Sequence, residues 1–323
     1  MFKVDEFVLG GLSACCAGVI TNPLEVVKTR IQLQGELKSR GHYVVHYRNV
    51  FHAFYAIASN ESVLALQKGL VPALWYQFFM NGIRFGAYQC FDNFGLTRNA
   101  NGDVIFHKSV VFGAASGAVG SFIGSPFYLV KTHLQSRSSA HIAVGHQHSH
   151  STMTGALTSI YKNYGIIGLW RGCAASMTRV TIGGAIQLST FASVKTFIDK
   201  SKIIPTDSFL NSLAAAMVGG LAVTLLMTPF DVISTRLYNQ PVDEKTGKGL
   251  KYSGIFNCMH KIATTEGILG FYKGWTASLL RLGPHTVLSL LFWTEIRKKY
   301  MSFKQKFEPK SSQINTISRT TTT

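Results

Sequence analysis

The sequence predicts an all-α membrane protein of six transmembrane helices, arranged as three pseudo-symmetric repeats. One observation is a proline-centred motif that recurs at intervals of 103 residues. Another is a glycine that ends a second, similar segment and recurs at intervals of 103 and 102 residues. The prolines are Pro23, Pro126 and Pro229, and the glycines are Gly69, Gly172 and Gly274. Two motifs that stay in register through three copies indicate an internal repeat.

Each repeat holds two apolar segments. The first segment of each pair is uncharged, over residues 7–24, 109–130 and 208–230, which are 18, 22 and 23 residues long. At about 1.5 Å per helical residue, these lengths roughly match the apolar core of a bilayer. The second segments, 69–83, 180–194 and 282–294, are each bounded by an arginine, and we expect them to score weakly for hydropathy. Three pairs of helices put both chain ends on the same side of the membrane.

The connections inside the repeats are longer and more basic than those between them. The long connections carry 16 Lys and Arg against 6 Asp and Glu, whereas the short ones carry 5 against 4. They are 28–68, 131–171 and 231–273, and the short ones are 92–108 and 195–207. The positive-inside rule places the long connections, with short helical patterns at 47–59 and 252–267, on the inner side.

The repeats divide the chain into three units and a tail. We assign residues 1–100, 101–203 and 204–303 to the three repeats. The remaining segment, 304–323, is polar and rich in threonine, so we expect it to be disordered.

Composition argues against soluble classes of protein. A net charge of +17 would suggest nucleic-acid binding in a soluble chain, but only 15% of the residues are charged and 46% are apolar. The basic residues lie in loops between apolar stretches, which favours anionic lipids or substrates as partners and no nucleic acid. No nucleophile–base pair and no phosphate-binding glycine loop stands out, so we expect neither an enzyme nor a cofactor.

Four histidines lie close together in the connection of the second repeat. They are His141, His146, His148 and His150. Histidine clusters of this kind can hold a metal, but the surrounding segment is rich in serine and predicts a solvated loop without fixed geometry. We therefore expect no metal site here.

The proline motifs resemble those of a known family. The segments PLEVVKTRIQ, PFYLVKTHLQ and PFDVISTRLY resemble the P-x-[DE]-x-x-[KR] motif of the mitochondrial carrier family, solute carrier family 25. The resemblance extends over about residues 5–303, and NPLEVVKTR, MTPFDV, TRLYNQ and RLGPHT are most similar to its oxaloacetate-carrier-like group. It implies a three-fold helix barrel in the mitochondrial inner membrane, alternating access around one central site, and a monomer in contact with lipids such as cardiolipin.

The residues after each proline suggest a gate on the inner side. Proline removes a backbone donor and kinks a helix, so three kinks would bring the inner helix ends together. If each acid pairs with the base of the next repeat, Glu25 meets Lys131 and Asp231 meets Lys28. The remaining positions hold Tyr128 and Ser234, so the second repeat lacks its acid and the third lacks its base. We predict a gate closed by two ion pairs and a Tyr128–Ser234 contact.

Other polar positions accompany the two gates. Gln32 and Gln135 follow the gate lysines by four residues and are expected to brace the ion pairs, with Tyr238 in the third equivalent position. At the opposite end, the acids of the family pattern are missing. Asp92 stands there at a position that is usually basic, and we expect it to pair with Lys195 or Arg297.

The resemblance also implies three substrate contact points, seven or eight residues after the landmark glycines. They fall at Tyr76 and Gln77, at Arg179, and at Arg281. Arg84 lies about two further helical turns along from Tyr76. Three guanidiniums in a wet cavity suit a small dianion, because arginine binds carboxylates bidentately and stays charged.

The chemical identity of the substrate is less defined than its charge. Gln77 and Gln187 are candidates to contact a carbonyl or hydroxyl group. The family's oxo-acid carriers prefer a polar residue after the second arginine, where this chain has Val180. The sequence therefore predicts an alternating-access carrier for a dicarboxylate or related oxo-acid. The alternatives are a proton-leak or inorganic-anion carrier and, more distantly, a basic nucleic-acid-binding protein.

Overall fold

The structure is a computed structural model that describes residues 4–39, 41–99, 105–201, 209–244 and 246–307. Within these ranges the chain is helical and forms no strand, which confirms the all-α prediction. Six long helices make up the body of the molecule. They are α1 (Val4–Leu33), α3 (Leu70–Asn93), α4 (Phe106–Ser136), α6 (Cys173–Ser201), α7 (Phe209–Asn239) and α9 (Trp275–Phe307).

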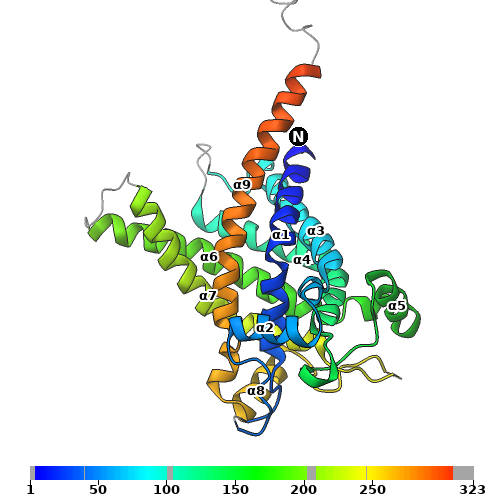
Figure 1. Cartoon of the computed structure of the whole chain (residues 1–323). Helices are drawn as coiled ribbons and strands as arrows, with labels where there is room; N and C mark the ends of the chain where they lie inside the picture. Colours follow the sequence, from blue (N-terminus) through cyan, green and yellow to red (C-terminus); the bar gives the residue numbers. More distant parts are fainter. Residues whose placement is uncertain (1–3, 40, 100–104, 202–208, 245, 308–323) are drawn as a thin grey trace, which may run out of the picture.

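The six long helices form a closed ring in chain order. Each helix packs against the next, and α9 packs back against α1. The short helices α2 (Val50–Asn60), α5 (Met153–Leu169) and α8 (Ile255–Thr265) lie at one end, together with the 3₁₀ turns η1 (Val63–Gln67), η2 (Ala140–Ile142) and η3 (Ile268–Tyr272). The start of α1 and the end of α9 point to the opposite end (Figure 1). The predicted pairing of helices and the common side for both chain ends are therefore confirmed.

The first long helix of each repeat is more apolar than the second, as predicted. Among the described residues, the helices long and apolar enough to cross a membrane are Val8–Leu33, Phe106–Ser136 and Val218–Asn239. The second helix of each repeat does not meet the same criterion, because it carries arginines and polar groups toward the interior. Burial in a polar cavity, and not in lipid, is what makes these charges tolerable.

The helices run further than the uncharged stretches that predicted them. Pro23, Pro126 and Pro229 lie inside α1, α4 and α7, so the motif residues after each proline are still helical. Whether each proline kinks its helix stays a prediction. Helix α9 reaches Phe307, which extends the last helix a few residues into the tail that we expected to be disordered. The rest of that tail lies outside the described residues.

The three landmark glycines start the second helix of each repeat. Gly69, Gly172 and Gly274 have φ values of 71°, 85° and 78°, in the left-handed region that favours glycine. A Cβ atom at these positions would lie 2.8 Å from Gln135 Cγ, 3.2 Å from the Tyr238 ring and 3.1 Å from Gln32 Cγ, in that order. We call α1, α4 and α7, which carry the predicted gate residues, the gate helices. Each landmark glycine lets one repeat pack closely on the gate helix of the next repeat.

Buried ion pairs hold the connections against the gate helices in the first and third repeats. Arg30 pairs with Glu61 at 2.6 Å, and Arg236 pairs with Glu266 at 2.5 Å. Each acid also accepts from a lysine at 2.5 Å, Lys68 in the first repeat and Lys273 in the third. The second repeat lacks this cluster: its equivalent residues are His133, Tyr164 and Arg171.

The expectation of a solvated histidine loop is wrong for part of the loop. The His148 ring stacks on buried His133 with 3.4 Å between ring centroids and an 11° interplanar angle. His150 lies nearly parallel to both rings, whereas His141 is exposed as expected. Burial and the nearby His146 lower the pKa of His148 to about 3. The gate helix supplies the ordered surface that the loop sequence does not reveal.

Small residues let α3 and α4 approach closely. A Cβ atom on Gly120 in α4 would lie only 2.6 Å from the backbone oxygen of Met80 in α3. Because that obstacle is backbone, it cannot swing aside as a flexible side chain can. Glycine thus permits a close helix contact that any larger residue would block.

We expect Gly120→Ala to lower stability by about 1–3 kcal/mol through overpacking of the α3–α4 interface. Thermal unfolding of the purified protein in detergent would measure the change. Gly283→Ala is the matched control, because no described atom lies within 4 Å of the added Cβ and alanine favours the helix. Equal Tm values for the two variants would contradict this account of the interface.

Candidate functional site

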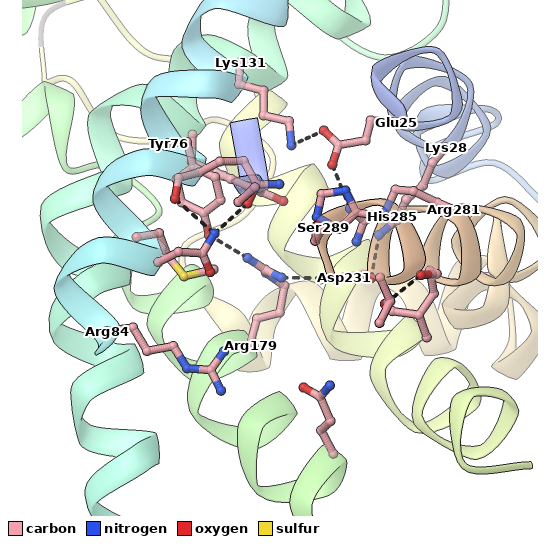
Figure 2. Close-up of a pocket in the computed structure, with 18 of the residues that line it drawn as sticks. Glu25, Lys28, Tyr76, Arg84, Lys131, Arg179, Asp231, Arg281, His285 and Ser289 are labelled. Carbon is pink, nitrogen blue, oxygen red and sulfur yellow. Dashed lines mark hydrogen bonds and ion pairs between the residues drawn. The ribbon is translucent and has the colours of Figure 1, made fainter. Parts of the chain in front are cut away.

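A cavity of about 870 Å³ lies inside the ring of helices. Its described lining includes five basic and two acidic side chains, so positive charge is in excess. The basic residues are Lys28, Arg84, Lys131, Arg179 and Arg281, and the acids are Glu25 and Asp231. Figure 2 shows these side chains converging from several helices. The predicted contact residues Tyr76, Gln77 and Gln187 line the same cavity.

The two predicted gate pairs are formed. Lys131 Nζ lies 2.5 Å from Glu25 Oε2, and Lys28 Nζ lies 2.6 Å from Asp231 Oδ2. Each pair joins the first helices of two different repeats. Lys131 links α4 to α1, and Lys28 links α1 to α7. The four side chains are largely buried, at 10–13% exposure, so water screens the pairs weakly. All four side chains line the cavity.

Each gate acid also holds an arginine of the candidate substrate site. Arg281 Nη1 donates to Glu25 Oε1 at 2.7 Å, and Arg179 Nη1 lies 3.5 Å from Asp231 Oδ1. Arg179 donates a further hydrogen bond to the Tyr76 hydroxyl at 3.0 Å. The sequence analysis assigned these two arginines to the substrate and did not connect them with the gate acids. Substrate site and gate are therefore one network (Figure 2).

The predicted contact between Tyr128 and Ser234 is not formed. Tyr128 instead packs between Tyr76 and Tyr238, with 4.9 Å between ring centroids in both pairs. Lys131 and Arg179 lie over its ring at 5.4 and 5.3 Å, which are favourable cation–π distances. Ser234 is fully buried, and its hydroxyl has no hydrogen-bond partner in the described part of the chain. An aromatic cluster thus takes the place of the third ion pair.

The glutamines do not brace the ion pairs directly, which corrects the prediction for Gln32 and Gln135. Gln135 accepts a hydrogen bond from Thr29 at 3.0 Å and donates to Asn22 at 3.1 Å. Gln32 accepts from Thr235 at 2.8 Å. Both side chains lie against a landmark glycine, so the close approach described above directs them into the interface between repeats.

Arg84 is the arginine that remains available. Its side chain points into the cavity in Figure 2, and no described carboxylate lies within ion-pair distance. Gln187 is exposed to the cavity, whereas Gln77 is buried and accepts a hydrogen bond from the Asn81 amide at 2.9 Å. The predicted site residues are thus brought together around one cavity. They differ in how many of their polar groups are already bound to other protein groups.

Two features at the edges of the site differ from the sequence analysis. His285 lines the cavity and is hydrogen-bonded to Thr21 at 3.0 Å, although we did not single it out. Its spacing of four residues from Arg281 places it on the same helix face and was the available signal. At the opposite end, Asp92 pairs with Arg98 at 2.8 Å, a partner that the sequence analysis did not name, and its pairing with Lys195 or Arg297 stays a prediction. The Lys195 side chain lies outside the described residues.

A ring of six helices in three repeats around a basic central cavity is the architecture of a membrane carrier. Comparison with known proteins gives the family. The model of the mitochondrial carrier protein family matches three segments, residues 2–99, 103–202 and 205–304. The chain belongs to the mitochondrial carrier family, whose members are transporters and not enzymes.

Individual relatives agree with this assignment. Solute carrier family 25 member 35 of Mus musculus is 52% identical over 298 residues, which are 92% of this chain and 99% of the relative. The mitochondrial oxaloacetate transport protein of Saccharomyces cerevisiae is 37% identical over 94% of this chain and 92% of its own length. Mitochondrial citrate transporter E of Aspergillus niger is 36% identical over 96% and 97%. The oxaloacetate-carrier-like group predicted from the sequence is thereby supported.

We expect Glu25→Gln to destabilise the closed gate, because Lys131 and Arg281 would both lose their carboxylate. Loss of one partner from a buried ion pair typically costs about 3–5 kcal/mol. The exchange Glu25→Lys with Lys131→Glu should recover part of this loss, since it restores the pair between α1 and α4. Thermal unfolding in detergent would measure both effects.

The matched control is Glu295→Gln, which alters an exposed pair between Glu295 and Lys298 at 3.1 Å. Such surface pairs contribute about 0–1 kcal/mol, so its Tm should change little. A double exchange no more stable than Glu25→Gln would show that Glu25 does not act through Lys131.

Proposed function

We propose that this protein carries a small dicarboxylate or related oxo-acid across the mitochondrial inner membrane by alternating access. The observation that carries the proposal is the charge of the cavity, with five basic and two acidic side chains in its described lining. A dianion would offset most of that excess. The printed names of two relatives, an oxaloacetate transport protein and a citrate transporter, support the same substrate class.

Substrate would first meet the arginine that lacks an acid. Arg84 projects into the cavity without a described carboxylate partner, so one carboxylate of the substrate can bind it bidentately. The second carboxylate would then compete with a gate acid for Arg281 or Arg179. The exposed amide of Gln187 is placed to recognise a carbonyl or hydroxyl group between the two carboxylates.

The shared acids give a way for substrate to loosen the gate. When substrate takes Arg281, Glu25 loses its contact to α9 and keeps only Lys131. When it takes Arg179, Asp231 loses its contact to α6 and keeps only Lys28. A ligand shifts a conformational equilibrium by its difference in affinity between the two states. Here that difference would come from arginines that bind gate acids when the cavity is empty and substrate when it is filled.

The proposal includes a setting for the protein. We place it in the inner membrane as a multi-pass monomer, with the basic long connections facing the matrix and lipids such as cardiolipin around it. Exchange of one anion for another would close the cycle, because each substrate would reset the same gate.

We expect liposomes that hold the purified protein to take up labelled oxaloacetate, malate or malonate in preference to ATP and glutamate. Arg179→Ala and Arg84→Ala should each reduce this uptake about tenfold or more, since each removes a charged hydrogen bond to the substrate. Arg48→Ala is the matched control, because Arg48 is exposed in a connection outside the cavity.

Three outcomes would argue against the proposal. Uptake of ATP or glutamate in place of dicarboxylates would contradict the substrate class. Dicarboxylate uptake that is indifferent to Arg179 and Arg84 would contradict the site. Sulfate uptake equal to that of the dicarboxylates would favour the inorganic-anion carrier.

A further inference from the structure

The second repeat differs from the other two at the inner end of its first helix. Where the first and third repeats carry Arg30 and Arg236, each in a buried ion pair, the second carries His133. The acid of the pair is replaced by Tyr164, so no carboxylate is available at the equivalent position. Instead, His148 and His150 of the following loop lie next to His133. Their ligand nitrogens and that of His133 all lie within 4.8 Å of one another.

Hydrogen bonds fix which nitrogen of each buried ring is free. His133 Nε2 donates to the Tyr238 carbonyl at 2.9 Å, and His148 Nε2 donates to the Asn239 carbonyl at 3.2 Å. These carbonyls belong to the last turn of α7, where helical partners run out. A neutral histidine whose Nε2 carries the proton has its lone pair on Nδ1.

The free nitrogen of His133 is buried without a partner. The residue is only 1% exposed, and Nδ1 has no hydrogen-bond partner among the described atoms. Leaving a buried polar atom unsatisfied costs free energy, so such an atom calls for an explanation. Metal-ligating histidines commonly bind through one nitrogen while the other donates to a backbone carbonyl, which is the arrangement of both His133 and His148.

We propose that His133, His148 and His150 form a binding site for a divalent transition-metal ion of the zinc class. A zinc–nitrogen bond is about 2.0–2.1 Å long, so the two loop rings turn out of their stack to bring their nitrogens onto the ion. The ion would take three protein ligands and leave one position for water. It would join the end of α4 to the loop, in the repeat that lacks the Arg–Glu pair.

The chemistry of the donors selects the ion. Three neutral imidazoles suit zinc, copper, nickel or cobalt, whereas magnesium and calcium prefer carboxylate and carbonyl oxygens. Arg171 acts electrostatically on His133 and His148 and lies over the Tyr164 ring at 5.4 Å. A neighbouring cation opposes a divalent ion, so affinity has to come from the metal–nitrogen bonds.

The test is zinc binding by the full-length protein in detergent. Zinc should raise the Tm of the wild-type chain by several degrees, because a ligand that binds only the folded state stabilises it. Direct analysis should find close to one bound ion per chain. His148→Ala and His150→Ala should abolish or strongly reduce both effects. Cobalt in place of zinc should give the visible absorption of a tetrahedral nitrogen site.

His141→Ala is the matched control, since His141 lies in the same loop but is exposed and outside the cluster. It should bind zinc as the wild type does, and all of these proteins keep the five free cysteines. Zinc binding that is equal in wild type, His148→Ala and His150→Ala would overturn the proposal, and so would the absence of retained zinc. His133→Arg with Tyr164→Glu rebuilds the ion pair of the other repeats and should fold without a zinc response.

Discussion

The closed state of this carrier depends on two carboxylates that each hold two cations. Glu25 contacts Lys131 and Arg281, and Asp231 contacts Lys28 and Arg179. Neither acid could be buried alone, because an unpaired charge in a largely dry site is strongly unfavourable. The lysines join the first helices of different repeats, whereas the arginines reach the same acids from the second helices. Everything that binds in the cavity therefore acts on the groups that close it.

Much of the fold can be predicted from the sequence because the same pattern of motifs occurs in all three repeats. The prolines and the landmark glycines set the register, and the structure gives the glycines a reason in their positive φ values. Both gate pairs could be predicted, since charge and spacing identify the partners. What one copy of a motif suggests weakly, three copies in register suggest strongly.

The remainder depends on contacts that the local sequence does not encode. Nothing in the segment around Gln135 says that its amide meets Thr29 and Asn22 of another repeat. Likewise, a serine-rich loop predicts solvation until His133 provides a surface on which His148 can stack. The sharing of Glu25 with Arg281 was missed because the motif assigns each acid a single partner. The partners of Gln135 and of Glu25 lie more than a hundred residues away along the chain, whereas His133 precedes His148 by only fifteen.

The cluster of Tyr76, Tyr128 and Tyr238 makes the contacts around the gate chemically unequal. Two of the three contacts are ion pairs, and the third is a set of packed aromatic rings. Separating the two ion pairs means pulling opposite charges apart in a buried setting, where salt screens them weakly. Parting the aromatic rings separates no charge and mainly exposes apolar surface. The ring of helices thus has two edges held by opposite charges and one held by apolar ring contacts. An anion that enters the cavity would compete with the acids at the two charged edges, whereas the contacts of the tyrosine edge would offer it nothing to displace.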